Sequence, residues 1–187
     1  MKRLFFPLAA VLVGASTFGQ GTILFNNRVT GQVDAPVNRS DGTGVGAGAN
    51  AQLYLVTGSG PSAAYTALYP ATTFRTTSAA AAFYVVQPPG PVIVPGIGAG
   101  QQATVVMRVW DGAIGSDYDA AVSRCEMNPI TITLGGVPAT GAPIPDAVLA
   151  GMQGPPGFGG CLRIVPEPST MALGLLGAAA LLCRRRK

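Results

Sequence analysis

Apolar and polar residues alternate with a period of two along several short stretches of the chain. The clearest stretch is 102–110, in which Val105, Met107 and Val109 share one face while Thr104 and Arg108 lie on the other. Because successive side chains of a β-strand point to opposite faces, this alternation predicts a strand that buries one face. The same pattern predicts strands at 22–25, 51–56, 81–86, 130–134 and 161–165, with weaker candidates at 67–75 and 91–94.

Segments rich in glycine and proline separate these strands. They lie at 38–50, 87–91, 135–145 and 151–160 and are predicted to be loops. One short helix is predicted at 117–124, with Ser116 as its N-cap, Asp119 three residues later and Arg124 near its end. Many short strands with one short helix predict an all-β fold, a single antiparallel β-sandwich of the jelly-roll or Ig-like type spanning residues 20–164.

The first 19 residues have the three regions of a secretory signal peptide. A basic head of three residues precedes an apolar run at 4–13 and a stretch of small residues at 14–19. Cleavage is expected before Gln20, with cleavage after Ala15 as the alternative. Ten apolar residues are too few for a transmembrane anchor, so the Sec translocon and signal peptidase are the expected partners of this segment.

The last residues, 165–187, have a different three-part arrangement. Pro166, Glu167 and Pro168 form a stiff extended segment, because each proline fixes φ and restricts the residue before it. An uncharged apolar run follows at 171–183. As a helix it would span roughly 20 Å, which is short against a hydrocarbon core of about 30 Å. The basic end places the three-residue motif on the outer side of the membrane. This end consists of Arg184, Arg185, Arg186 and Lys187.

The combination of Pro-Glu-Pro, a short transmembrane helix and an arginine-rich end resembles the PEP-CTERM sorting signal of Gram-negative bacteria. The resemblance implies an exosortase-type membrane protease that recognises Pro166, Glu167 and Pro168. The chain would be anchored in the inner membrane until it is processed. It would then reach the cell surface, the outer membrane or the extracellular matrix, with exopolysaccharide as a further partner. An ordinary tail anchor is the alternative. Residues 20–27, 107–111 and 115–120 also resemble PEP-CTERM ectodomains, for which the resemblance implies no activity.

Removal of both ends changes the charge of the protein. The whole chain carries 12 Lys and Arg against 8 Asp and Glu, but between residues 20 and 165 six arginines face seven acids, a net charge of −1. A nucleic-acid-binding protein needs a clustered basic face. Nucleic acid is therefore not an expected partner of the mature segment.

The absence of histidine excludes most catalytic arrangements. Without it there is no Ser-His-Asp or Cys-His nucleophile and no His-ligated metal. The two lysines, Lys2 and Lys187, lie in the processed ends, which excludes a Ser-Lys dyad. The glycine-rich stretch at 42–48 precedes a strand instead of following one, which argues against a dinucleotide-binding loop. No cofactor and no enzymatic activity are predicted.

Three acids remain as candidates for chemistry: Asp111, Asp117 and Asp119. The favoured interpretation is local, because aspartate stabilises turns and helix N-termini. The alternatives are a carboxylate pair of the kind that hydrolyses glycosidic bonds and a weak calcium site.

Cys125 and Cys161 are the two cysteines of the mature segment, since Cys183 lies in the apolar tail. Exported proteins form disulfides in oxidising compartments, so a Cys125–Cys161 bridge is predicted, with two separate buried thiols as the alternative.

The aromatic residues offer one further possibility, a carbohydrate-binding surface on which sugar rings stack. The favoured interpretation is that most of these side chains pack within or across the sheet. The candidates are Trp110, Tyr54, Tyr65, Tyr69, Tyr84 and Tyr118. The sequence thus predicts a non-enzymatic surface or matrix protein. A carbohydrate-binding module and an Asp-dependent carbohydrate-active enzyme are the alternatives.

Overall fold

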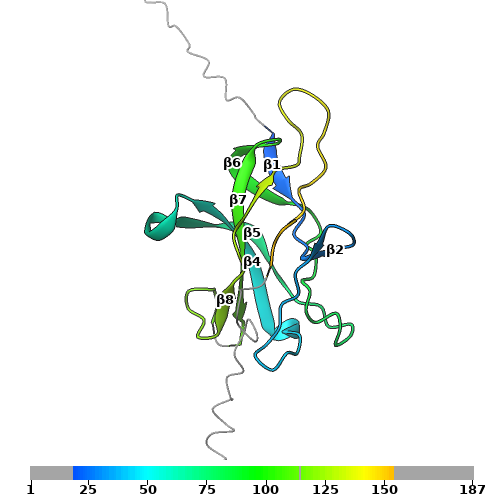
Figure 1. The fold of residues 1–187 in the computed structure, drawn as a ribbon, viewed down its shortest axis with the longest axis vertical. Helices are drawn as coiled ribbons and strands as arrows, with labels where there is room; N and C mark the ends of the chain where they lie inside the picture. Colours follow the sequence, from blue (N-terminus) through cyan, green and yellow to red (C-terminus); the bar gives the residue numbers. More distant parts are fainter. Residues whose placement is uncertain (1–18, 114, 154–187) are drawn as a thin grey trace, which may run out of the picture.

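The computed structural model describes residues 19–113 and 115–153. Most of the predicted signal peptide, the predicted strand at 161–165 and the predicted sorting segment lie outside these residues. Within them, no helix is long and apolar enough to cross a membrane. The elements are β1 (Gln20–Ile23), β2 (Arg28–Val29), β3 (Val33–Asp34), η1 (Gly46–Gly48), β4 (Ala49–Thr57), η2 (Gly60–Ser62), β5 (Ala64–Thr73), β6 (Val92–Gly98), β7 (Gln102–Asp111), β8 (Arg124–Glu126) and β9 (Ile130–Thr133), where η denotes a 3-10 turn (Figure 1).

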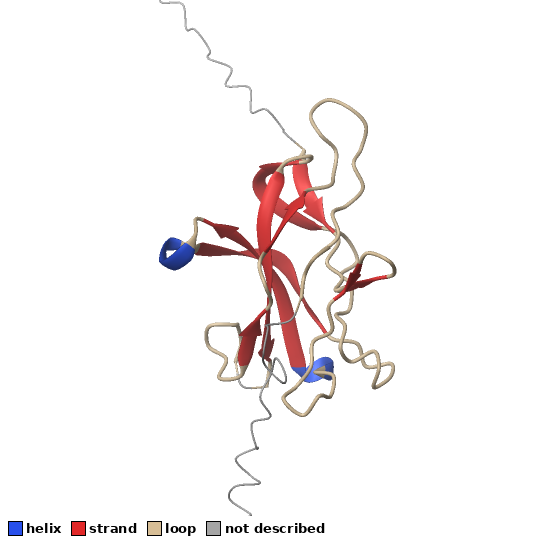
Figure 2. Cartoon of the chain, viewed as in Figure 1, coloured by secondary structure: helices blue, strands red, loops and turns tan. Residues whose placement is uncertain are grey.

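The long strands β4 and β7 lie at the centre of a five-stranded sheet with the order β5-β4-β7-β8 (Figure 2). β9 also pairs with β7. The remaining edge of β7 is therefore shared, with Trp110 opposite Arg124 of β8 and Gln102 opposite Thr133 of β9. All named strand pairs are antiparallel, including β1 with β6 and β2 with β3. The prediction of an all-β protein with antiparallel sheets is confirmed.

One face of the large sheet is buried in a single apolar core. Leu53 of β4 and Val105, Met107 and Val109 of β7 are fully buried at alternate positions. The same core cluster contains Ile23 of β1 together with residues of β6 and β9. The alternation in the sequence therefore identifies the core-facing positions correctly. The predicted strands at 51–56, 102–110 and 130–134 correspond to β4, β7 and β9, that at 22–25 to β1, and the weaker candidates to β5 and β6.

The predicted strand at 81–86 is wrong. The chain turns there, because the backbone N–H groups of Ala81 and Ala82 donate to the carbonyl of Ser78 and Tyr84 N–H donates to Ala81. Val85 alone forms an isolated bridge, with Phe74. Its N–H is taken by the side chain of Asn27 instead of a neighbouring strand.

The predicted helix at 117–124 is also wrong. The local signal is real, since Asp117 Oδ1 accepts hydrogen bonds from the N–H groups of Asp119 and Ala120. The segment makes turns and bends instead, and Arg124 begins β8, which pairs with β7. Pairing with the large sheet overrides the local preference for helix.

Candidate functional site

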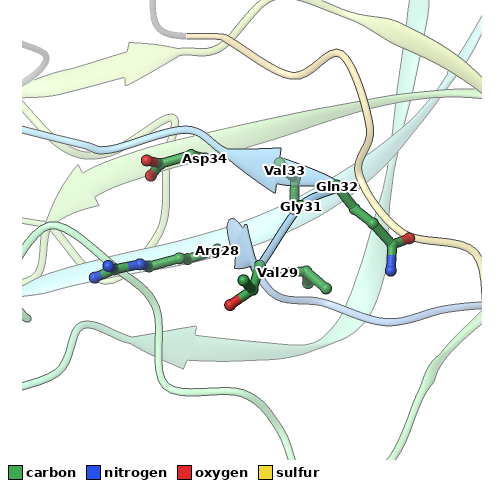
Figure 3. Close-up of a pocket in the computed structure, with 7 residues that line it drawn as sticks. Arg28, Val29, Gly31, Gln32, Val33 and Asp34 are labelled. Carbon is green, nitrogen blue, oxygen red and sulfur yellow. The ribbon is translucent and has the colours of Figure 1, made fainter.

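A surface hollow of about 390 Å³ is formed by the β2–β3 hairpin. It is lined by residues 28–34 (Figure 3). The chain reverses where Gln32 N–H donates to Val29 C=O over 2.9 Å. Gly31 is the third residue of this turn and has a φ of 77°. A type II turn requires a positive φ at that position, which glycine adopts without strain. Beyond the turn, the buried Val33 fixes the hairpin to the core.

Two charged side chains border this hollow. Arg28 and Asp34 pair opposite each other across the hairpin. Figure 3 shows both side chains extending in the same direction from the two strands, whereas Gln32 extends to the opposite side. Arg28 and Asp34 are both exposed. The hairpin thus presents a cation and an anion side by side to solvent.

Tyr84 contacts both charged side chains and fixes their positions. Its hydroxyl donates to Asp34 Oδ1 over 2.8 Å, and the guanidinium carbon of Arg28 lies 4.6 Å from the centroid of its ring. Burial raises the pKa of Tyr84 above its usual value. The hydrogen bond to Asp34 raises it further, against an opposing effect of nearby arginines. The phenol therefore stays protonated at neutral pH and remains a donor to Asp34.

Arg28 differs from the other four arginines of the described residues. Within this part of the chain its guanidinium makes no hydrogen bond or ion pair, so its N–H donors face solvent. Each of the others is engaged: Arg39 with Val45, Arg75 with Val85, Arg108 with Glu126, and Arg124 with Tyr118.

The sequence interpretation missed this site. The two strands have two residues each, too short for a period-two pattern to be recognised. The available signal was the short sequence from Val29 to Val33, in which two valines flank three residues with Gly31 at the centre. Such spacing is typical of a tight hairpin. The role of Tyr84, 50 residues from Asp34 in the sequence, has no local signal.

The three predicted candidate acids are each held by local contacts. Asp111 accepts from Ala113 N–H and lies 3.8 Å from an Arg39 nitrogen. Asp117 caps its own turn, and hydrogen bonds hold its pKa below the usual value. Asp119 forms an ion pair with Arg124 at 3.5 Å. Across the described residues no group of three or more His, Cys, Asp or Glu side chains is arranged to hold a metal ion.

The aromatic residues considered for a sugar-binding surface lie in different environments, and some are buried as the favoured interpretation expects. Trp110 is 3% exposed and Tyr84 is 8% exposed, so neither offers a free ring face to a sugar. Trp110 Nε1 is buried without a hydrogen-bond partner in the described part of the chain. The most exposed ring is that of Tyr69, at 75%.

Three other tyrosines surround one arginine on the second face of the large sheet. The guanidinium carbon of Arg108 lies 4.8 Å from the ring centroid of Tyr54, 3.8 Å from that of Tyr65 and 4.6 Å from that of Tyr118. Arg108 also forms a 2.6 Å ion pair with Glu126. We call these five residues the Arg108 cluster. It links β4, β5, β7 and β8 to the 112–123 loop.

We expect Arg108→Ala to lower the free energy of unfolding by about 2–3 kcal/mol, since it removes a partly buried ion pair and three cation–ring contacts. Urea denaturation followed by circular dichroism measures this change. The matched control is Arg124→Ala, because Arg124 also contacts Tyr118 but forms an exposed pair, which we expect to cost no more than about 1 kcal/mol. Equal losses in the two variants would contradict the role assigned to Arg108.

Cys125 lies in β8, partly buried against the core. Its predicted partner Cys161 is outside the described residues, so the disulfide stays a prediction. Pro166, Glu167, Pro168 and the basic end at 184–187 also lie outside them, and their assignment depends on the sequence alone.

The described residues thus form a β-rich unit that precedes residues 154–187 in the chain. The family model described as the PEP-CTERM protein-sorting motif matches residues 165–187. No curated protein and no solved structure matches the chain. The chain therefore carries a PEP-CTERM sorting signal, which confirms the resemblance of its tail. The signal indicates an exported protein that is sorted at a membrane by an exosortase-type processing system.

Proposed function

We propose that the chain is a non-enzymatic protein of the cell surface, the outer membrane or the extracellular matrix, associated there with exopolysaccharide. The observation that carries this proposal is the sorting motif at 165–187. The Sec translocon and signal peptidase would remove residues 1–19. The tail would then hold the protein in the inner membrane until an exosortase cleaves near Glu167.

The composition of the mature segment supports a role without catalysis. It contains no histidine and no lysine. The acids considered for glycoside hydrolysis are engaged in a turn, an exposed ion pair and a contact with Arg39. No observation on the described residues favours the carbohydrate-active enzyme. The hollow bordered by Arg28 and Asp34 does favour the second candidate, a carbohydrate-binding module.

Two finer structural features belong to this proposal. The β1–β6 pair and the five-stranded sheet would be the two layers of a β-sandwich, supported by the core cluster that both share. A disulfide between Cys125 and Cys161 would join β8 to the end of the domain, supported by export into an oxidising compartment.

We expect Glu167→Ala to block processing of the full chain in the cells that make it, because the change removes the charged residue of the recognised motif. The precursor should keep its tail and stay in the inner-membrane fraction, as measured by mass spectrometry and fractionation. Asp146→Ala is the matched control, since it removes an exposed acid outside the motif, and we expect it to be processed normally. Loss of the tail from the Glu167 variant would contradict the proposal.

A further inference from the structure

We propose that the hollow of the β2–β3 hairpin binds one uncharged sugar residue, and that Arg28 and Asp34 hold two of its hydroxyl groups. This site builds on the proposed function, in which the exported chain meets a polysaccharide. It adds a location and a ligand class to that function. The sorting signal by itself predicts neither the location of a binding site nor the class of its ligand.

Arg28 provides the donors. Guanidinium presents five N–H groups in a planar fork and accepts no hydrogen bond. In the described residues Arg28 uses none of these donors for a protein partner, whereas the four other arginines all do. Stacking at 4.6 Å on the Tyr84 ring holds the side chain at the rim of the hollow. A side chain that is already positioned loses less entropy when a ligand binds.

Asp34 provides the acceptors. The Tyr84 hydroxyl occupies one position on Oδ1 and fixes the orientation of the carboxylate. An ionised carboxylate offers about four lone-pair positions. Oδ2 has no hydrogen-bond partner among the described residues, so acceptor positions remain for a ligand. The buried Tyr84 therefore orients both charged groups without filling the hollow.

The pairing of these two groups selects the chemistry of the ligand. Arg28 and Asp34 occupy facing positions of the hairpin yet form no direct ion pair. A group that lies against both must accept from the guanidinium and donate to the carboxylate, which a hydroxyl does. An anionic ligand would be repelled by Asp34 and a cationic one by Arg28. Adjacent hydroxyls on an uncharged ring satisfy both groups.

The size and openness of the hollow set the expected strength. Its volume of about 390 Å³ lies at the lower end of the range for small-molecule sites. One hairpin supplies all seven lining residues, so a sugar would stay exposed on its outer side. We expect a millimolar dissociation constant for a monosaccharide. A polysaccharide that offers many such residues to many copies of the protein would bind more strongly through multivalency.

Titration calorimetry with the exported protein, recovered from the cells that make it, tests this site. The probes are glucose, galactose and mannose, with glucuronate as the charged comparison. We expect at least one neutral sugar to bind, and Arg28→Gln and Asp34→Asn each to weaken that binding at least tenfold. Arg28→Lys keeps the charge but loses the fork, and should weaken binding as well. Unchanged melting temperatures would show that the variants are folded.

Gln102→Ala is the matched control, because Gln102 is exposed on β7 and does not line the hollow. We expect its affinity to stay within twofold of the original. The site would be overturned if no neutral sugar binds, if the Arg28 and Asp34 variants bind unchanged, or if glucuronate binds tenfold more tightly than every neutral sugar. None of these results bears on tail processing. Conversely, cleavage of the Glu167 variant would contradict the proposed sorting without affecting the calorimetry.

Discussion

Replacing Asn27 by alanine is expected to lower the free energy of unfolding by about 3–4 kcal/mol. The side chain is fully buried and joins three backbone positions. Its Nδ2 donates to the carbonyls of Ala35 and Phe83, at 2.7 and 3.2 Å, and its Oδ1 accepts from Val85 N–H at 2.9 Å. Alanine would leave the Ala35 carbonyl and the Val85 N–H buried without a partner, and each such group costs about 1–3 kcal/mol, whereas the Phe83 carbonyl keeps the Val37 N–H.

Urea denaturation of the exported protein, followed by circular dichroism, measures this loss. Asn38→Ala is the matched control, since Asn38 is half-buried and its side chain makes no hydrogen bond within the described residues. We expect this control to change stability by less than about 0.5 kcal/mol. A similarly small loss for Asn27→Ala would show that Asn27 does not hold the three segments together.

Replacing Cys161 by serine is expected to lower the free energy of unfolding by about 3–4 kcal/mol, if the proposed bridge to Cys125 closes a loop of about 35 residues. The loss arises because the unfolded chain regains the freedom that the bridge removes. Denaturation without reductant, compared between the original protein and the variant, measures it.

Cys183→Ser is the matched control for the bridge. Cys183 lies in the apolar tail, which the proposed processing would remove, so this change should not alter the stability of the exported protein. Thiol counting gives an independent check. Two reactive thiols in the denatured, unreduced protein would exclude the bridge.

The regular half of the fold was predictable from local pattern alone. β4, β7 and β9 each bury every second side chain against the core, and that burial requires the alternation seen in the sequence. The segment at 81–86 alternates in the same way, yet its backbone groups are satisfied by turns, by the side chain of Asn27 and by single backbone groups of Val37, Gly46, Thr73 and Arg75. The local pattern predicts which side chains are buried. Residues far away in the sequence decide which groups hydrogen-bond to the backbone.

The candidate site was less predictable for the same reason. Asp117 was correctly expected to act as a local cap or turn residue, because its partners lie within three positions of it. Arg28 and Asp34 become a site only when Tyr84 packs against them. Trp110 remained a candidate for a sugar-binding ring beside the favoured interpretation of a packed residue, and its exposure of 3% agrees with the favoured one. Long-range packing decides both outcomes.

The shared edge of β7 has a consequence for how copies of the protein meet one another. β8 has three residues and β9 four, and Pro129 lies in the gap between them. An incoming strand from another molecule would therefore find two short, separated segments instead of a continuous row of free backbone groups. Short edges and prolines are the features by which β-proteins avoid edge-to-edge aggregation. On this side of the sheet, many copies could crowd together on a surface without polymerising through their strands.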